Sequence, residues 1–103
     1  MSQVAVFAKI AAAPGKRAAL RAALQSLLDG AENEAGTLMY LLHEDNADEN
    51  LLWMYELYAS QEALKLHMGS EGFKAAGPTL APFLAGRPEL NFVTPTGGKG
   101  LPS

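Results

Sequence analysis

Residues 50–76 read NLLWMYELYASQEALKLHMGSEGFKAA, and this stretch carries the most informative pattern in the chain. Its first part, LLWMYELY, is predicted to be a strand, whose side chains alternate between two faces. One face would carry Leu51, Trp53, Tyr55 and Leu57, and the other Leu52, Met54, Glu56 and Tyr58. Because neither face is polar throughout, we expect this strand to be covered on both sides.

The second part of the stretch predicts a helix over 61–68, with Ser60 as its N-cap and Gly69 as its end. Residues 71–76 are expected to add a short turn that carries Phe73, which the Gly77–Pro78 pair then ends. Residues 78–83 are expected to form a short irregular or helical piece.

Three further strands and one long helix are predicted around this stretch. The strands cover 4–11, 37–44 and 89–93, and the helix covers about 16–33, where leucines recur at spacings of three and four. The resulting order, strand–helix–strand–strand–helix–strand, is that of a ferredoxin-like α+β sandwich. In this fold two helices cover one face of a four-stranded antiparallel sheet.

The other face of the sheet would expose large apolar side chains, among them Trp53 and Tyr55. Burying such aromatics is worth a few kcal/mol each, and an exposed cluster of them invites aggregation. We therefore expect a homodimer that joins through this face. Residues 1–93 would form the single domain, and the Gly/Pro-rich residues 94–103 a flexible tail or an arm ordered on the partner.

Composition excludes several classes of function. The chain has 103 residues, a net charge of −3 and no cysteine, which argues against nucleic-acid partners, anionic membranes, thiolate catalysis and Cys-based metal sites. Its two histidines have no matching acidic spacing, so no metal site is expected. No apolar stretch could span a bilayer and the N-terminus lacks the features of a signal peptide, so we expect a soluble cytoplasmic protein.

Several short motifs together resemble the antibiotic-biosynthesis monooxygenase (ABM) domain family. They are Pro14–Gly15 before the long helix, Glu34-Ala35-Gly36-x-x-x-Tyr40, Tyr55-Glu56-x-Tyr58-x-Ser60-x-Glu62-Ala63-Leu64, and Leu66–His67. The resemblance covers about residues 4–93, and it depends on the order and spacing of the motifs together. It implies a dimeric α/β barrel, with the C-terminal strand or arm often reaching the partner.

The resemblance also implies a range of activities. Family members include quinol and polyketide monooxygenases that use no metal or organic cofactor, and haem-degrading enzymes. The haem-degrading branch uses an Asn on the first strand, a Trp at the position of Tyr58, and a His after a segment like Phe73-Lys74-Ala75-Ala76. Here the first strand has no Asn and Gly77 follows that segment, so the sequence argues against haem degradation.

Cofactor-free oxygenation requires an apolar cavity, a proton acceptor, and polar groups that hold a substrate anion. His67 is the natural proton carrier, because its unperturbed pKa is about 6.5. Tyr58 is placed to donate a hydrogen bond to a quinol or quinone oxygen. The remaining expected substrate-binding residues are Met54, Glu56, Leu64, Met68 and Phe73.

Each of these residues also has a structural interpretation. His67 could pack in the core, Tyr58 could end a strand in water, and Glu56 could be paired for structure alone. Two functions therefore remain open. One is a cofactor-independent monooxygenase that oxidises a quinol or aromatic polyketide-like substrate; the other is a non-catalytic dimeric protein that binds a small apolar or aromatic ligand.

Overall fold

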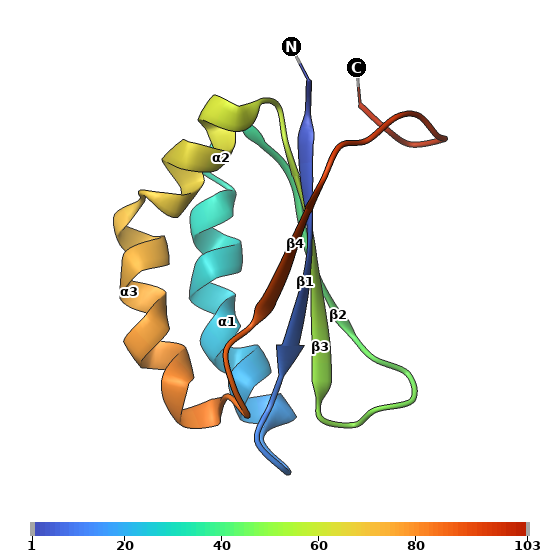
Figure 1. Cartoon of the computed structure of the whole chain (residues 1–103). Helices are drawn as coiled ribbons and strands as arrows, with labels where there is room; N and C mark the ends of the chain where they lie inside the picture. The colour runs from blue at the N-terminus through green and yellow to red at the C-terminus, as the bar shows by residue number, and fades with distance from the viewer. Residues whose placement is uncertain (1, 103) are drawn as a thin grey trace.

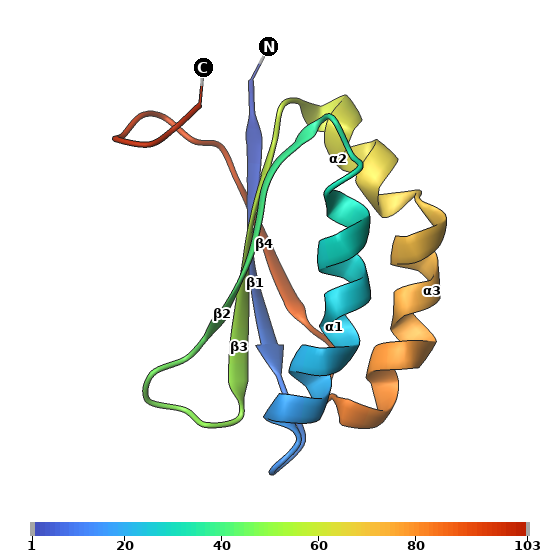
Figure 2. The same cartoon turned by 180° about the vertical axis from the view of Figure 1, so that it is seen from behind.

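The computed structural model describes residues 2–102 and confirms the ferredoxin-like α+β sandwich (Figure 1). The elements are β1 (Val4–Ala11), α1 (Arg17–Ala31), β2 (Thr37–Glu44), β3 (Leu51–Tyr58), α2 (Gln61–Met68), α3 (Glu71–Leu80), the 3-10 turn η1 (Ala81–Phe83) and β4 (Glu89–Val93). The strands form one antiparallel sheet in the order β2-β3-β1-β4. All the helices lie on one side of this sheet (Figures 1 and 2).

The central strand β3 is hydrogen-bonded to β1 on one edge and to β2 on the other. Its helix-side residues are almost fully buried, with Leu52 at 0% and Met54 at 2% exposed. They pack against the leucine stripe of α1, which consists of Leu20, Leu24 and Leu27. The predicted alternation of β3 therefore places the apolar core between the sheet and α1.

The outer face of the sheet is covered only in part, by the C-terminal segment. Residues 94–101 have no regular secondary structure, and most of them line a hollow together with Ala5, Tyr55 and Leu57. Figure 1 shows this segment continuing from β4 on the side of the sheet away from the helices. The Gln3 side chain holds the end of this segment, since its Nε2 donates a hydrogen bond to the Pro102 carbonyl at 2.8 Å. Met1 and Ser103, which begin the predicted domain and end the predicted tail, lie outside the described residues.

The prediction that Gly77–Pro78 ends the segment after residue 71 is wrong, because α3 continues through both residues to Leu80. The Ser70 side chain caps this helix by accepting a hydrogen bond from the Phe73 N–H. Ala76 and Leu80 are both 8% exposed and belong to the main core. Pro78 lies on the exposed side, where the carbonyl that it leaves without a partner can bond to water, so packing outweighs its helix-breaking tendency.

Gly36 allows α2 to approach the turn between α1 and β2. A Cβ at position 36 would lie 2.6 Å from the Cβ of Ala63, a separation that real side chains do not adopt. The Ala59 N–H also bonds to the Gly36 carbonyl at 2.9 Å. The close packing of Gly36 against Ala63 sets the distance of α2 from the sheet. It therefore also sets the position of the side chains on the inner face of α2.

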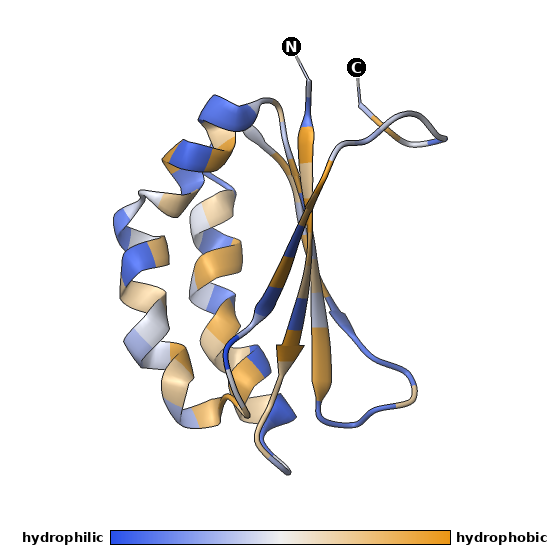
Figure 3. Cartoon of the chain, in the orientation of Figure 1, coloured by the Kyte–Doolittle hydropathy of each residue, from blue (hydrophilic) through white to orange (hydrophobic). Residues whose placement is uncertain are grey.

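Apolar stretches recur along the strands and helices, whereas the connection between β2 and β3 is mostly polar (Figure 3). Within residues 2–102, no helix is both long and apolar enough to cross a membrane.

Replacing Gly36 with Ala should destabilise the fold by about 1–3 kcal/mol, because the new methyl group overlaps Ala63 in a packed contact. Gly30→Ala is the matched control: a Cβ there meets nothing within 4 Å, and replacing this glycine in the last turn of α1 should stabilise by at most about 0.5–1 kcal/mol. Urea denaturation of both variants tests this pair. Equal stability of the two variants would contradict the proposed contact.

Candidate functional site

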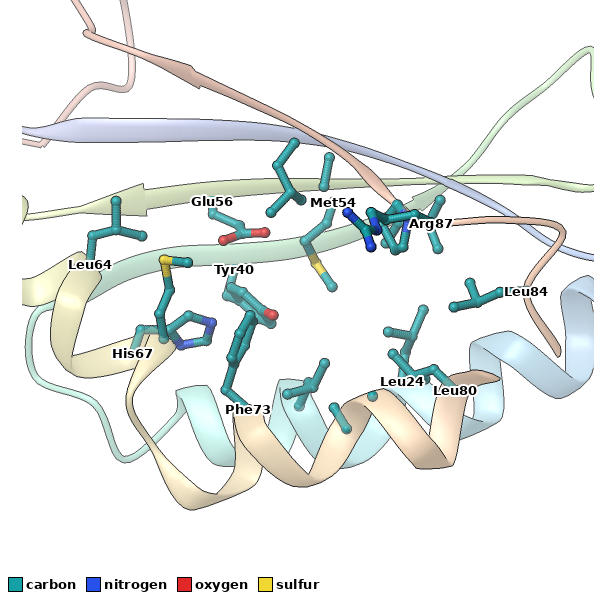
Figure 4. Close-up of a pocket in the computed structure, with 18 residues that line it drawn as sticks. Leu24, Tyr40, Met54, Glu56, Leu64, His67, Phe73, Leu80, Leu84 and Arg87 are labelled. Carbon is teal, nitrogen blue, oxygen red and sulfur yellow. The ribbon is translucent and has the colours of Figure 1, made fainter. Parts of the chain in front are cut away.

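A cavity of about 320 Å³ lies between the sheet and the helices (Figure 4). This volume is within the range of small-molecule sites. Most of its wall is apolar. The lining residues include Ile10, Leu24, Leu27, Met54, Leu64, Met68, Phe73, Leu80, Leu84 and Leu90, and the polar ones Tyr40, Glu56, His67 and Arg87.

His67 lies at the α2 end of the cavity, next to Tyr40 and Phe73 (Figure 4). Its side chain is 3% exposed, and its Nδ1 is 2.7 Å from Oε1 of Glu34. Its other ring nitrogen, Nε2, is buried and has no hydrogen-bond partner among the described residues. The ring is enclosed by three aromatic rings, Tyr40, Phe73 and Tyr58, with centroid separations of 5.1–5.4 Å.

Glu34 orients this histidine. A carboxylate only accepts hydrogen bonds, so Nδ1–H must be the donor, and Nε2 of the neutral ring is then an acceptor. The same Oε1 also accepts a hydrogen bond from the Thr37 hydroxyl at 2.7 Å, which holds the carboxylate in place. The result is a basic nitrogen with a fixed tautomer at the wall of an apolar cavity.

The turn that carries Glu34 is placed by the close Gly36–Ala63 contact described above. Ala63 precedes His67 by one helical turn on α2, and both residues are buried on its inner face. The absence of a side chain at Gly36 thus lets the turn and the helix approach until Glu34 and His67 meet.

Glu56 is a second carboxyl group at the cavity wall, and it points into the cavity (Figure 4). The Tyr58 hydroxyl donates a hydrogen bond of 2.6 Å to its Oε1. Burial raises the pKa of Glu56 above its usual value, although the Tyr58 bond and the nearby His67 partly oppose the shift.

Both tyrosines of the site remain protonated at neutral pH. Burial, with the Glu56 charge as the next cause, raises the pKa of Tyr40 and the pKa of Tyr58 well above the ordinary value. The Tyr40 hydroxyl faces the cavity (Figure 4), so it offers a stable hydrogen-bond donor to a ligand oxygen.

The structure brings together all but one of the residues predicted for the site. His67, Met54, Glu56, Leu64, Met68 and Phe73 line the cavity. Tyr58 is 0% exposed and is not among the lining residues; it touches the site through its hydrogen bond to Glu56 and the packing of its ring on His67.

Sequence reasoning assigned no role to Glu34, Tyr40 or Arg87. Glu34 and Tyr40 both belong to the Glu34-Ala35-Gly36-x-x-x-Tyr40 motif, and this motif was the sequence feature that could have pointed to a role for them in the site. Arg87 belongs to no motif that we recognised. Within residues 2–102, no group of three or more His, Asp or Glu side chains is arranged to hold a metal ion.

Comparison with known proteins agrees with the fold and the motifs. The family model described as "Antibiotic biosynthesis monooxygenase" matches residues 3–78. A curated relative from Mycobacterium tuberculosis, named "Putative monooxygenase Rv0793", is 41% identical over 69 residues, which is 67% of each chain.

Solved structures are similar over almost the whole chain. An antibiotic biosynthesis monooxygenase homologue from Caulobacter crescentus has a TM-score of 0.87 at 33% identity, covering 93% of this chain and 92% of its own. The structure of Rv0793 has a TM-score of 0.86 at 30% identity, covering 96% of this chain and 100% of its own. PA3566 from Pseudomonas aeruginosa has a TM-score of 0.85 at 29% identity, covering 94% and 97%.

Taken together, the motifs, the fold and the family match over residues 3–78 establish that this chain belongs to the antibiotic biosynthesis monooxygenase (ABM) family.

Proposed function

We propose that this protein is a cofactor-independent monooxygenase that oxidises a quinol or an aromatic polyketide-like substrate with O₂. The observation that supports this most is the Nε2 atom of His67, which is buried at the end of an apolar cavity, has no hydrogen-bond partner among residues 2–102, and belongs to a ring that Glu34 holds through Nδ1. A buried acceptor without a partner is rare in folded proteins and calls for an explanation such as a missing ligand. A substrate hydroxyl would provide the partner.

In the proposed reaction, Nε2 of His67 accepts a proton from the substrate, and the Glu34 carboxylate stabilises the imidazolium that forms. The Tyr40 hydroxyl donates a hydrogen bond to the substrate oxyanion. The electron-rich anion then transfers an electron to O₂, and the two radicals combine. For an anthrone-type methylene, one oxygen atom becomes the new carbonyl oxygen, and the other leaves as water with the two hydrogens of that carbon.

The apolar walls serve this chemistry by excluding water. Met54, Leu64, Met68 and Phe73 would contact the aromatic rings of the substrate. Glu56 would contact the substrate directly, with Tyr58 holding its carboxyl group in place.

One observation favours the alternative, a non-catalytic dimeric protein that binds a small aromatic ligand. Tyr58, which we expected to reach the substrate, has its hydroxyl engaged by Glu56. Oxygen uptake with a panel of hydroquinones and anthrones, without added metal or flavin, separates the two functions. Binding of these compounds without oxygen uptake would support the alternative.

His67→Ala should lower turnover at least tenfold, equivalent to about 1.4 kcal/mol of barrier, because it removes the proton acceptor. Glu34→Gln should also lower turnover, since an amide cannot stabilise the imidazolium by charge. His43→Ala is the control, because His43 is the other histidine and lies exposed on β2. Oxygen consumption rates measure all three; unchanged turnover in His67→Ala would remove His67 from the mechanism.

Glu56→Gln should remove one contribution to stability that is lost as pH rises. The pKa of Glu56 is raised in the folded state, so the wild-type protein loses stability as pH rises from the ordinary carboxyl pKa, about 4.3, through the folded value. The variant has no such titration. The unfolding free energy of wild type minus variant, measured in urea from acid to neutral pH, should therefore decrease as pH rises. Parallel stability curves would show that burial does not perturb this carboxyl group.

We further propose that the protein is a homodimer that joins through the outer face of the sheet, which carries Trp53 and Tyr55. A row of apolar side chains crosses this face, because Leu41 and Phe7 both pair in register with Tyr55. Leu41 is 49% and Phe7 48% exposed, although the ring of Phe7 already packs on Tyr55 at 5.2 Å. Aromatic rows of this kind are typical of the centres of protein interfaces.

Leu41→Glu should convert the dimer to a monomer at micromolar concentration, because it places a charge in the middle of the apolar row. Leu66→Glu is the control, since Leu66 is 78% exposed on α2, away from the sheet face. Sedimentation velocity of the wild type and both variants gives the oligomeric state. A monomeric wild type at that concentration would refute the interface.

A further inference from the structure

The cavity has a cationic group at the end opposite His67. Arg87, in the connection between η1 and β4, lines the cavity on the far side of Met54 from Glu56 and His67 (Figure 4). Between these ends the wall is apolar, formed by residues such as Leu24, Leu27 and Leu80. An elongated ligand would therefore meet a base at one end and a guanidinium at the other.

Arg87 forms no salt bridge within residues 2–102. The nearest carboxylate in sequence, Glu89, pairs in register with Lys9, while Leu90 pairs with Ala8. Since Leu90 and Ala8 line the cavity, alternation along β4 puts Glu89 on the outer face of the sheet.

The backbone around Arg87 is fixed although its side chain is free. On the N-terminal side, the Ala85 N–H bonds to the Ala11 carbonyl at 2.9 Å, and the Ala13 N–H bonds to the Phe83 carbonyl at 2.9 Å. On the C-terminal side, Pro88 restricts the chain and β4 begins at Glu89. The backbone therefore holds Arg87 at this end of the cavity, where its exposed side chain can bind a ligand without ordering a loop.

From this arrangement we propose that Arg87 selects substrates carrying a carboxylate at the end remote from the ring that is oxidised. This inference rests on the proposed function, because it specifies the substrates of the same site. They would be flat aromatic quinols or polyketide-like compounds that carry a carboxylate. Arginine recognises a carboxylate with two parallel N–H donors, and it remains charged at every physiological pH. A neutral aromatic ligand would leave this cation without a counter-charge.

The first test measures KM for two substrates. One is a dihydroxynaphthoate whose carboxylate is on the ring that lacks the two hydroxyls, and the other is its methyl ester. We expect the acid to have a KM about tenfold lower than the ester in the wild type, the size of one charge-assisted hydrogen bond at a partly exposed site. Arg87→Gln should abolish this preference by raising the KM for the acid alone. Arg87→Lys should keep part of it, and added salt should reduce it.

Arg21→Gln is the matched control, because Arg21 bonds to Gln25 on α1 and does not line the cavity. It should keep the full preference for the acid. Equal KM values for acid and ester in the wild type, or the same loss in both arginine variants, would overturn the role of Arg87.

A binding experiment separates this inference from the proposed reaction. Naphthoate and methyl naphthoate lack the hydroquinone, so their binding by titration calorimetry does not depend on oxygen chemistry. Tighter binding of naphthoate that is lost in Arg87→Gln, without oxygen uptake on any quinol, would support the anion site and refute the monooxygenase. Oxygen uptake on quinols with no difference between naphthoate and its ester would refute the anion site and leave the proposed function standing.

Discussion

The alternation of β3 is the constraint on which the rest of the structure depends. This strand is bonded on both edges, and it is covered on its inner face by α1 and on part of its outer face, at Tyr55 and Leu57, by the C-terminal segment. A slip of one residue would move Glu56 and Tyr58 to the outer face and Tyr55 into the leucine core. The burial of large side chains on both faces therefore determines one register, and that register places Met54 and Glu56 at the wall of the cavity.

The polar groups of the cavity follow from a second constraint, that buried polar atoms need partners. His67 and Glu56 each have one partner within the chain, Glu34 and Tyr58 respectively. Both partnerships leave a polar atom facing the cavity, and for His67 that atom is fully buried. Under the proposed function, the substrate would supply the missing half of each of these hydrogen bonds.

The fold could be predicted almost completely because its signals are local. The four strands, α1 and α2 follow from alternation and from leucine spacing, and the Ser60 cap is observed as a hydrogen bond to the Ala63 N–H. The exception is α3, where the local signal of Gly77–Pro78 was outweighed by the burial of Ala76 and Leu80, a tertiary effect. The site was predicted less completely. Strand alternation and helix spacing identified His67 and the apolar lining. Glu34 was missed because it is 33 residues from His67 in the sequence, and Arg87 because it lies in a connection without periodicity.

The order of elements and the division of β3 into two faces follow from the sequence alone, because the period of the side chains is visible along one dimension. The family was indicated by short motifs in their order and spacing. Three features are visible only in the tertiary structure: the Tyr58 hydroxyl bonds to Glu56, Glu34 fixes the tautomer of His67, and Arg87 lies at the end of the cavity opposite His67. The physical reason is that hydrogen bonds between side chains extend over only about 3 Å, so they depend on how closely separate elements approach. That approach is set by packing contacts such as Gly36 on Ala63, which no local pattern encodes.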